Sequence, residues 1–380
     1  MAISGALAGA AQPVGAAQPI AAASESAAEL PRAWTVRVGP AGSVAMPVIY
    51  RDKAFTTDAS LVTAVGLAGG NVRWQVDHTD PQFGPLYLGE PSLVGGQIWA
   101  PWSFAKYGGV MVHDPKTGEF TMSSGTTLSI GHVVTNRGRR AALFGAVIPG
   151  LALLALDDGG LPGLIDLTSS GFASYSDPVF AGSHVWVGYG GSLLRFDQRV
   201  CEPPPVDIPY CMPNAHVPLA DAVVGVAGAS DDKVVATTVN GVVHVFNGLN
   251  GVELWRATPG GKLATPAVVG DVVAVGGSDG KVHAYDVNGC NAAVCRALWS
   301  GDAGSPIATA PAIGNGFVFV GTDTGTVVAF AVGGCASGTC APVAIGHAKK
   351  PSVITGDPVV GGDRVVVGTA DGHLVAFSMP

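Results

Sequence analysis

One repeated unit in the C-terminal half of the chain constrains the fold more than any other feature. It reads first as Val234–Phe246, again as Val272–Asp286 and around Gly316–Ala331, and last as Arg364–Ser378. Each copy is a short apolar run, a turn of Gly, Asp or Asn, and a second apolar run, which is the pattern of a β-hairpin. A hairpin that recurs along a chain predicts a repeat architecture built from sheets.

Weaker copies of this unit extend through most of the remaining chain. Each begins with an apolar strand that carries a proline near its start, and these prolines are Pro47, Pro91, Pro178, Pro266, Pro311 and Pro358. Proline removes a ladder donor, so it is expected on a strand with one unpaired edge. The fourth strand of the unit often closes on tryptophan, as at Trp74, Trp255 and Trp299. Four antiparallel strands in a unit of roughly 40–50 residues are the signature of a β-propeller.

The number of units follows from the third strands, which are the clearest. They are centred near Val62, Met111, Leu154, Leu194, Val243, Val282, Val328 and Val375. The sequence therefore predicts an all-β, eight-bladed propeller of four-stranded antiparallel blades. The last unit stops at Pro380 without a fourth strand, whereas Ala33–Val38, which contains Trp34, is a strand without a unit. We expect this N-terminal strand to complete the last blade and close the ring, because closure removes an exposed sheet edge.

Residues 1–31 form a lead-in, and residues 32–380 a single propeller domain. The lead-in is rich in alanine, contains Pro13 and Pro19, and has no charge before Glu25. It has the composition either of the tail of an export signal or of a flexible tail of the mature chain, and both interpretations stay open. The apolar stretch Leu143–Leu156 is too short to span a membrane and is interrupted by Pro149, so it predicts two strands and a turn.

The cysteines form three close pairs: Cys201 with Cys211, Cys290 with Cys295, and Cys335 with Cys340. All three pairs fall between a third and a fourth strand. An even number of cysteines at one repeated location predicts local disulfides, and hence an extracytoplasmic, oxidising compartment. A metal site is the alternative, but the spacing is not Cys-x-x-Cys and no histidine lies beside a pair. We expect no metal.

Charge excludes one class of partner. The formal net charge is −8, with no block of lysine and arginine. Because binding to nucleic acid depends on neutralising phosphates with a basic surface, we expect no nucleic-acid partner.

Two segments carry a family resemblance. Val112–Gly118 and Val245–Trp255 loosely match the pattern Ala-x-Asp-x-x-Thr-Gly-x-x-x-Trp, which resembles the repeat of the pyrroloquinoline-quinone-like propeller superfamily. That superfamily includes quinoprotein alcohol dehydrogenases and non-enzymatic outer-membrane assembly scaffolds. Its dehydrogenases hold the quinone and calcium with adjacent cysteines, a tryptophan floor and acidic and amide side chains. No two cysteines are adjacent in this chain, so we expect neither pyrroloquinoline quinone nor calcium as a cofactor.

The second unit contains the main irregularity. Its turn is lengthened to Pro101–Gly108, and the connection before it, Asp77–Glu90, is also long. Propeller topology places both loops on one face, around the mouth of the channel. The candidate ligand-binding residues there are Trp99, Trp102, Phe104, Tyr107, His78 and Asp80. They predict a shelf for a sugar or a peptide. The alternative is that the aromatics cover a small core of the loop itself.

Two other motifs are interpreted as structural. Gly276–Gly280 matches the Gly-x-Ser-x-Gly elbow of hydrolases, but it lies between two strands, where that motif has no helix to expose its serine. His244 and His283 share one register in successive units and are expected to be packed, hydrogen-bonded strand residues rather than metal ligands.

The function expected from these features is that of a monomeric, non-catalytic scaffold that binds a protein or a glycan. The alternatives are a quinoprotein dehydrogenase-like enzyme or an enzyme acting on polysaccharide. For the latter, Asp80 with His78 is the one hint of an acid–base pair. We favour the scaffold, and expect no membrane span.

Overall fold

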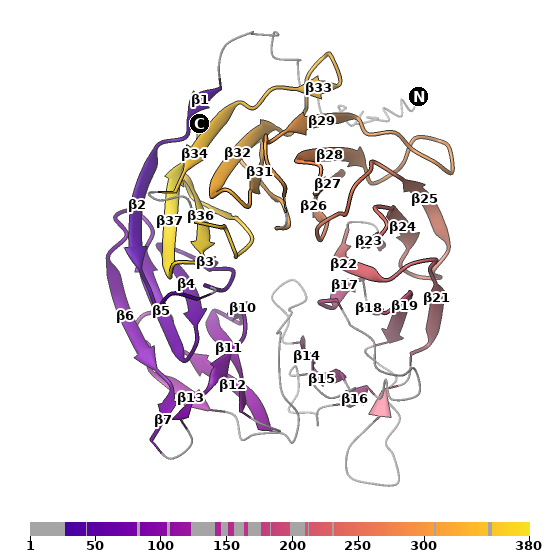
Figure 1. The fold of residues 1–380 in the computed structure, drawn as a ribbon. Helices are drawn as coiled ribbons and strands as arrows, with labels where there is room; N and C mark the ends of the chain where they lie inside the picture. Colours follow the sequence, from indigo (N-terminus) through magenta and orange to yellow (C-terminus); the bar gives the residue numbers. More distant parts are fainter. Residues whose placement is uncertain are drawn as a thin grey trace, which may run out of the picture.

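The chain forms sheets arranged around a common centre. The computed structural model describes residues 27–380 apart from residues 43, 82–83, 105–106, 123–140, 146–150, 156–162, 166–175, 183, 198–209, 212, 230–231, 308 and 349–351. Within these residues there is no helix, and the strands make eight sheets of four or five strands and one two-stranded sheet. No membrane-spanning helix occurs in the described part of the chain. The sheets follow one another in chain order around the centre, so the fold is a β-propeller (Figure 1).

The first four sheets have the following strands. The first sheet contains β3 (Val48–Tyr50), β4 (Lys53–Asp58), β5 (Leu61–Gly66) and β6 (Val72–Asp77). The second contains β10 (Ser92–Val94), β11 (Gln97–Phe104), β12 (Tyr107–His113) and β13 (Phe120–Met122), with β9 (Tyr87–Leu88) beside β11. The third contains β14 (Ala141–Gly145), β15 (Leu151–Ala155), β16 (Gly163–Ile165) and β20 (Tyr210–Cys211). The fourth contains β17 (Val179–Ala181), β18 (His184–Tyr189), β19 (Ser192–Asp197) and β21 (Ala215–Pro218). The two-stranded sheet pairs β7 (Thr79–Asp80) with β8 (Gly84–Pro85).

The last four sheets are more regular. The fifth contains β22 (Val223–Gly228), β23 (Lys233–Thr238), β24 (Val243–Asn247) and β25 (Glu253–Ala257). The sixth contains β26 (Ala267–Val269), β27 (Val272–Gly276), β28 (Lys281–Asp286), β29 (Trp299–Asp302) and β33 (Thr339–Cys340). The seventh contains β30 (Ala312–Gly314), β31 (Phe317–Gly321), β32 (Thr326–Ala331), β34 (Ala344–His347) and β1 (Ala28–Glu29). The eighth contains β35 (Val359–Gly361), β36 (Arg364–Thr369), β37 (His373–Ser378) and β2 (Arg32–Arg37).

The predicted strand pattern is confirmed. All eight predicted third strands are present, as β5, β12, β15, β19, β24, β28, β32 and β37. Each of the six prolines immediately precedes the first strand of its sheet. The expected strands within Leu143–Leu156 are β14 and β15, which pair antiparallel.

An Asp or Asn side chain stabilises the turn after the third strand. The side chain of Asp114 accepts hydrogen bonds from the backbone N–H groups of Lys116 and Thr117. Asn247 makes the same contacts with Leu249 and Asn250. Such Asx turns reverse the chain, which explains why the repeat carries Asp or Asn at this position.

The N-terminal strand lies where the sequence predicted it. β2 pairs antiparallel with β37, the third strand of the eighth sheet, with Thr35 opposite Val375. β1 pairs parallel with β34 of the seventh sheet. Ala28 and Glu29 belong to the predicted lead-in, so the sheet structure begins before residue 32.

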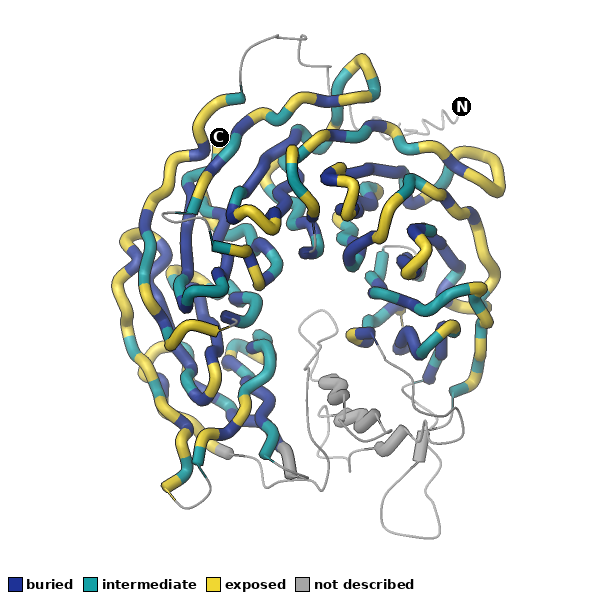
Figure 2. The backbone as a smooth tube through the Cα atoms, in the orientation of Figure 1, coloured by how far each residue is buried: buried dark blue, intermediate teal, exposed yellow. Residues whose placement is uncertain are grey.

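The hydrophobic core is divided among the contacts between neighbouring sheets. Between the eighth and first sheets, Trp34 packs with Val366, Ala54 and Val65 in one buried cluster. Figure 2 shows buried residues along the inner strands and exposed residues along the outer rim. Because each inner strand is covered on both sides, its apolar run is continuous, as in Val272–Gly276.

One predicted loop is wrong. Pro101–Phe104 continues β11 and Tyr107–Gly108 begins β12, with Phe104 opposite Tyr107. The long segment therefore extends the hairpin rather than its turn. Trp and Phe fit a pleated strand well, and Pro101 does not prevent the pairing in this register.

Candidate functional site

The predicted aromatic shelf is divided between two faces of β11. Trp102 is only 7% exposed and packs with Leu86 and Met111, with Leu88 and Phe104 at the edge of the cluster. Trp99 lies on the opposite face of the strand, because successive side chains alternate. Tyr107 is placed only by its backbone, opposite Phe104. Trp102 and Phe104 thus come together, in a small core of the extended hairpin.

The exposed aromatic residue of this region is Tyr87. It is 66% exposed and lies on β9, which pairs with β11 so that Tyr87 is opposite Ser103. The sequence showed only that Tyr87 lies in Asp77–Glu90, the long connection before the second unit. Which aromatic of that connection would be exposed could not be inferred without knowing that β9 joins the sheet edge.

His78 lies between the first and second sheets rather than at an open site. Its ring contacts His113 edge-on, with centroids 5.1 Å apart, and Phe120 at 4.5 Å. Burial and the neighbouring His113 lower the pKa of His78 to about 4, and burial also lowers the pKa of His113. Both rings are therefore neutral at pH 7. Asp80 belongs to the separate sheet of β7 and β8.

The other histidines singled out from the sequence are packed strand residues. His244 is 9% exposed, and its Nδ1 lies 2.6 Å from a carboxylate oxygen of Glu253. His283 is 8% exposed; burial lowers its pKa, opposed by Asp279, whose carboxylate lies 3.7 Å away. The described residues contain no group of three or more His, Cys, Asp or Glu side chains placed to hold a metal ion.

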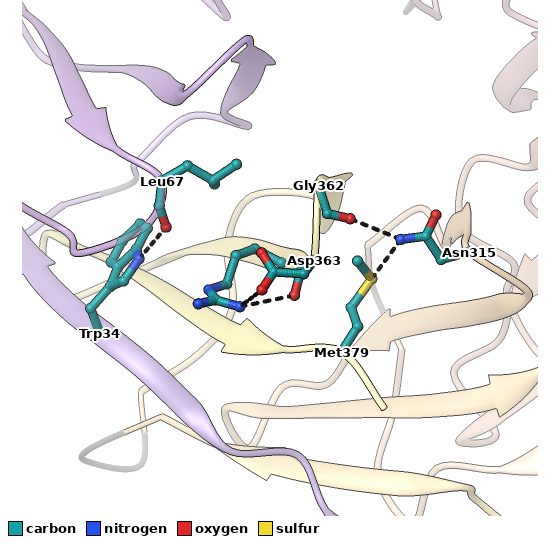
Figure 3. A network of polar contacts seen from close by, with 7 residues as sticks. Trp34, Leu67, Asn315, Gly362, Asp363 and Met379 are labelled. Carbon is teal, nitrogen blue, oxygen red and sulfur yellow. Dashed lines mark hydrogen bonds and ion pairs between the residues drawn. The ribbon is translucent and has the colours of Figure 1, made fainter.

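Four tryptophans of fourth strands join neighbouring sheets by one repeated contact, which Trp186 of β18 also makes with Gly248 at 3.2 Å. Each indole N–H donates to a carbonyl just after the third strand of the next sheet. The pairs are Trp34–Leu67 at 2.7 Å, Trp74–Pro115 at 3.3 Å, Trp255–Val287 at 3.0 Å and Trp299–Val332 at 3.0 Å. Figure 3 shows the Trp34 contact, which joins the eighth sheet to the first. Gly70 packs against the Trp34 ring with φ +71°, and a Cβ there would lie 2.6 Å from the ring, so only glycine fits.

The described cystines lie in the connections between third and fourth strands, as predicted. Disulfides join Cys290 to Cys295 and Cys335 to Cys340. The pairing of Cys201 with Cys211 lies outside the described residues. Cys295 and Cys340 are 6% and 7% exposed and belong to the cores between the fifth and sixth and the sixth and seventh sheets. Each cystine connection therefore contributes to the contact between its sheet and the preceding one.

A small polar cavity lies beside the strand that completes the eighth sheet. Its volume is about 240 Å³, and it is lined by Thr35, Ala348, Ser352, Thr369, Asp371, His373 and Val375. Although burial raises the pKa of Asp371, hydrogen bonds from Thr369 and His373 lower it overall. Thr369 donates to this carboxylate at 2.7 Å, and Nδ1 of His373 lies 3.2 Å from it. The carboxylate is thus engaged within the hairpin and is not a free base.

The described cystines and joining tryptophans do not converge on one place in the fold. The described cystines lie in connections to the outermost strands, and the four joining tryptophans are packed between sheets. Neither set forms a floor or a ring for a planar cofactor.

Comparisons with known proteins agree with this fold. Residues 217–293 match the family model described as outer membrane protein assembly factor BamB. The structure is similar to a computationally designed protein, Ika8, with a TM-score of 0.69 and 16% identity, covering 90% of this chain and 98% of that one. It is also similar to BamB from Moraxella catarrhalis, with a TM-score of 0.66 and 14% identity, covering 92% of this chain and 99% of that one. The curated proteins contain no significant sequence match.

These findings place the chain in the class of β-propellers. Residues 217–293 are similar to the BamB family repeat, and the fold of the whole chain is similar to that of BamB.

Proposed function

We propose that this chain is a monomeric, extracytoplasmic scaffold that binds another protein and works without a quinone. Its rigid core would be a closed ring of eight blades, with β2 as the outer strand of the last blade. The contact of Trp34 with Leu67 supports closure, because it repeats between the eighth and first sheets what Trp255 and Trp299 do elsewhere. The two cystines support an oxidising compartment.

An apolar patch on the outer rim carries the proposal of protein binding. We call Val252, Leu254, Val294 and Leu298 the rim patch; they are 57%, 42%, 58% and 61% exposed. They come from β25 and its preceding turn and from the cystine connection of the sixth sheet. These two segments lie together, because Arg256 N–H donates to Ala293 at 2.9 Å and Cys295 N–H donates to Arg256 at 2.8 Å. Exposed apolar side chains on adjoining segments are typical of interaction surfaces.

Site-specific photo-crosslinking tests this proposal. A photoreactive residue at Leu298, introduced in cells that produce the protein, should give one discrete protein adduct. The matched control is Val269, which is 52% exposed but is the last residue of β26, the first strand of its sheet. Equal labelling at both positions would contradict a specific partner. Stoichiometric quinone in the purified protein, together with dye-linked dehydrogenase activity, would replace the scaffold with an enzyme.

A second candidate surface is the aromatic hairpin, favoured by the exposure of Tyr87. An exposed aromatic ring beside polar groups suits a sugar or a peptide. The Tyr87→Ala variant should then lose glycan or peptide binding without loss of stability. The Trp102→Ala variant should lose stability, because that ring is buried.

A further inference from the structure

Several sheets of this molecule accept a short added strand on their outer edge. β33 pairs parallel with β29, β20 with β16, and β1 with β34. Val294 forms a single parallel bridge with Arg256 of β25. We call each of these added segments a guest strand. Three guest strands come from the connection that precedes the fourth strand of the next sheet. The remaining guest strand, β1, likewise precedes β2, which is the fourth strand of the eighth sheet.

The length of that connection decides whether a guest strand forms. The cystine connection between β32 and β34 is long enough to reach back to β29. In the first sheet the corresponding connection is only Leu67–Asn71, too short to reach back to β2. Among the described strands, none pairs with the outer edge of β2 or of β6. Within the described part of the chain, these two neighbouring edges are therefore open.

The open edge of β2 has the same hydrogen-bonding geometry as the occupied edges. On β29, the N–H of Ser300 donates to Gly338 at 2.8 Å, and on β34 the C=O of Ile345 accepts from Leu30 at 2.8 Å. Thr35 is the corresponding residue of β2, since it follows Trp34 as Ser300 follows Trp299. Its backbone N–H and C=O therefore point away from β37, as they do at Ile345 opposite Val328. Such outward groups are a template for β-strand addition.

The charge on β2 selects what would pair with it. Arg32 and Arg37 lie at its two ends and are both exposed. Each guanidinium donates to a backbone carbonyl, of His347 and Gly39 respectively, and neither forms an ion pair with a described residue. β6 instead carries Arg73 together with Asp77. In a chain of net charge −8, β2 is thus a locally basic edge.

We propose that the edge of β2 binds an extended, acidic segment of a protein partner as an added parallel strand. This rests on the proposed function, since it gives the scaffold a second, chemically defined contact. Backbone hydrogen bonds at Thr35 hold the segment, and Arg32 and Arg37 select acidic side chains near its ends. The competing explanation is that the two arginines only prevent the edges of two molecules from pairing.

A peptide from this chain supplies a defined probe. The acetylated and amidated peptide of residues 25–31 has two glutamates and includes the chain's own guest strand Ala28–Glu29. It should bind the intact protein in fluorescence anisotropy and slow exchange of the Thr35 amide proton. A peptide with lysine in place of both glutamates should bind at least about tenfold more weakly, and added salt should weaken binding of the acidic peptide.

Two variants test the surface itself. Thr35→Pro removes the outward N–H and leaves the pairing with β37, while Arg32→Glu with Arg37→Glu reverses the charge. Each should weaken binding at least about tenfold. Gln75→Pro, at the corresponding position of β6, is the matched control and should leave binding unchanged. Unfolding midpoints show whether each variant is folded. If Thr35→Pro does not fold, the variant with Arg32→Glu and Arg37→Glu tests the proposal instead.

Absence of peptide binding, or binding without protection of the Thr35 amide and unaffected by the arginine changes, would overturn the β2 proposal. An adduct at Leu298 in the same protein would show that the proposed function survives that failure. Peptide binding at β2 without any adduct at Leu298 would instead count against the rim patch.

Discussion

The seventh sheet is joined to each of its two neighbours by a segment in the same position, but the two segments differ in chemistry. On one side, Cys340 of a cystine connection is buried between the sixth and seventh sheets and is the last residue of guest strand β33. On the other, Leu30 is buried between the seventh and eighth sheets, next to guest strand β1. Cys340 lies four residues before Ala344, and Leu30 four residues before Trp34. The N-terminal segment therefore occupies the place of a cystine connection, without a covalent bond and across the ends of the chain.

The N-terminal segment is held against the C-terminal sheets without a covalent bond. A cystine reduces the conformational freedom of the unfolded chain, here only over a short loop. The N-terminal segment is instead held by packing and hydrogen bonds alone. Asn315 adds a contact between the seventh and eighth sheets by donating to Gly362 at 2.8 Å (Figure 3). We therefore expect substitutions in the N-terminal segment to lower the free energy of unfolding at least as much as loss of a cystine does.

The largest effect is expected at Trp34. Trp34→Ala should lower the free energy of unfolding by about 3–5 kcal/mol, because it removes a buried ring and a hydrogen bond to Leu67. Trp299→Ala, which removes the same contact between the sixth and seventh sheets, should lower it by a similar amount. Denaturant unfolding measures both. A small effect at Trp34 with a large one at Trp299 would show that the chain ends are joined differently from the other sheets.

Leu30→Ala should follow, with a loss of about 2–4 kcal/mol, since Leu30 is 1% exposed within the core of the seventh and eighth sheets. Glu29→Ala, at an exposed position of the same guest strand, should change stability little and serves as the control. Equal, small effects of both changes would argue that β1 is not held against β34.

Removal of one cystine sharpens the comparison. Cys335→Ala with Cys340→Ala should destabilise the protein by about 2 kcal/mol in the loop-entropy model. The protein should still fold, because guest strand β33 keeps its pairing with β29. Thermal unfolding with and without reductant measures the difference. Complete loss of folding would mean that the cystine connections are essential where the N-terminal segment is not.

The contact between the first and second sheets has no described cystine or guest strand, and it should respond to pH. The pKa of His78 falls to about 4 in the folded chain, against about 6.5 unfolded. Between these values the unfolded state binds the extra proton, so stability should decrease as pH falls from 6.5 towards 4, by about 1 kcal/mol per pH unit. His78→Phe should flatten this slope in unfolding measurements between pH 7 and 5. An unchanged slope would place the pH sensitivity elsewhere.

Local patterns predicted most of the fold. The alternation around Val282 and Val375 located third strands, prolines such as Pro266 located the first, and the unassigned strand around Trp34 predicted how the last sheet is completed. The pairs Cys290–Cys295 and Cys335–Cys340 followed from even spacing at one place in the repeat. These features depend on residues close together in sequence, or on a repeat whose copies can be compared with one another.

The candidate site was harder to predict for a physical reason. Trp102 and His78 were singled out by residue type, but their burial depends on Met111 and His113, which come from other strands. Guest strands involve only two residues paired in parallel, with no hydrophobic period of their own. Their presence depends on the length of a connection and on an unpaired edge in the preceding sheet.

The most direct test of the account is a pair of engineered cysteines at Thr35 and Val375. These residues are opposite each other with their backbone groups directed away from the partner strand, and such cross-strand pairs lie within the distance that a disulfide requires. We expect Thr35→Cys with Val375→Cys to form a disulfide in the folded protein, whereas Thr35→Cys with Leu374→Cys, one residue out of register, should not. Failure of the first pair to form, or equal formation of both, would contradict completion of the last sheet by the N-terminal strand.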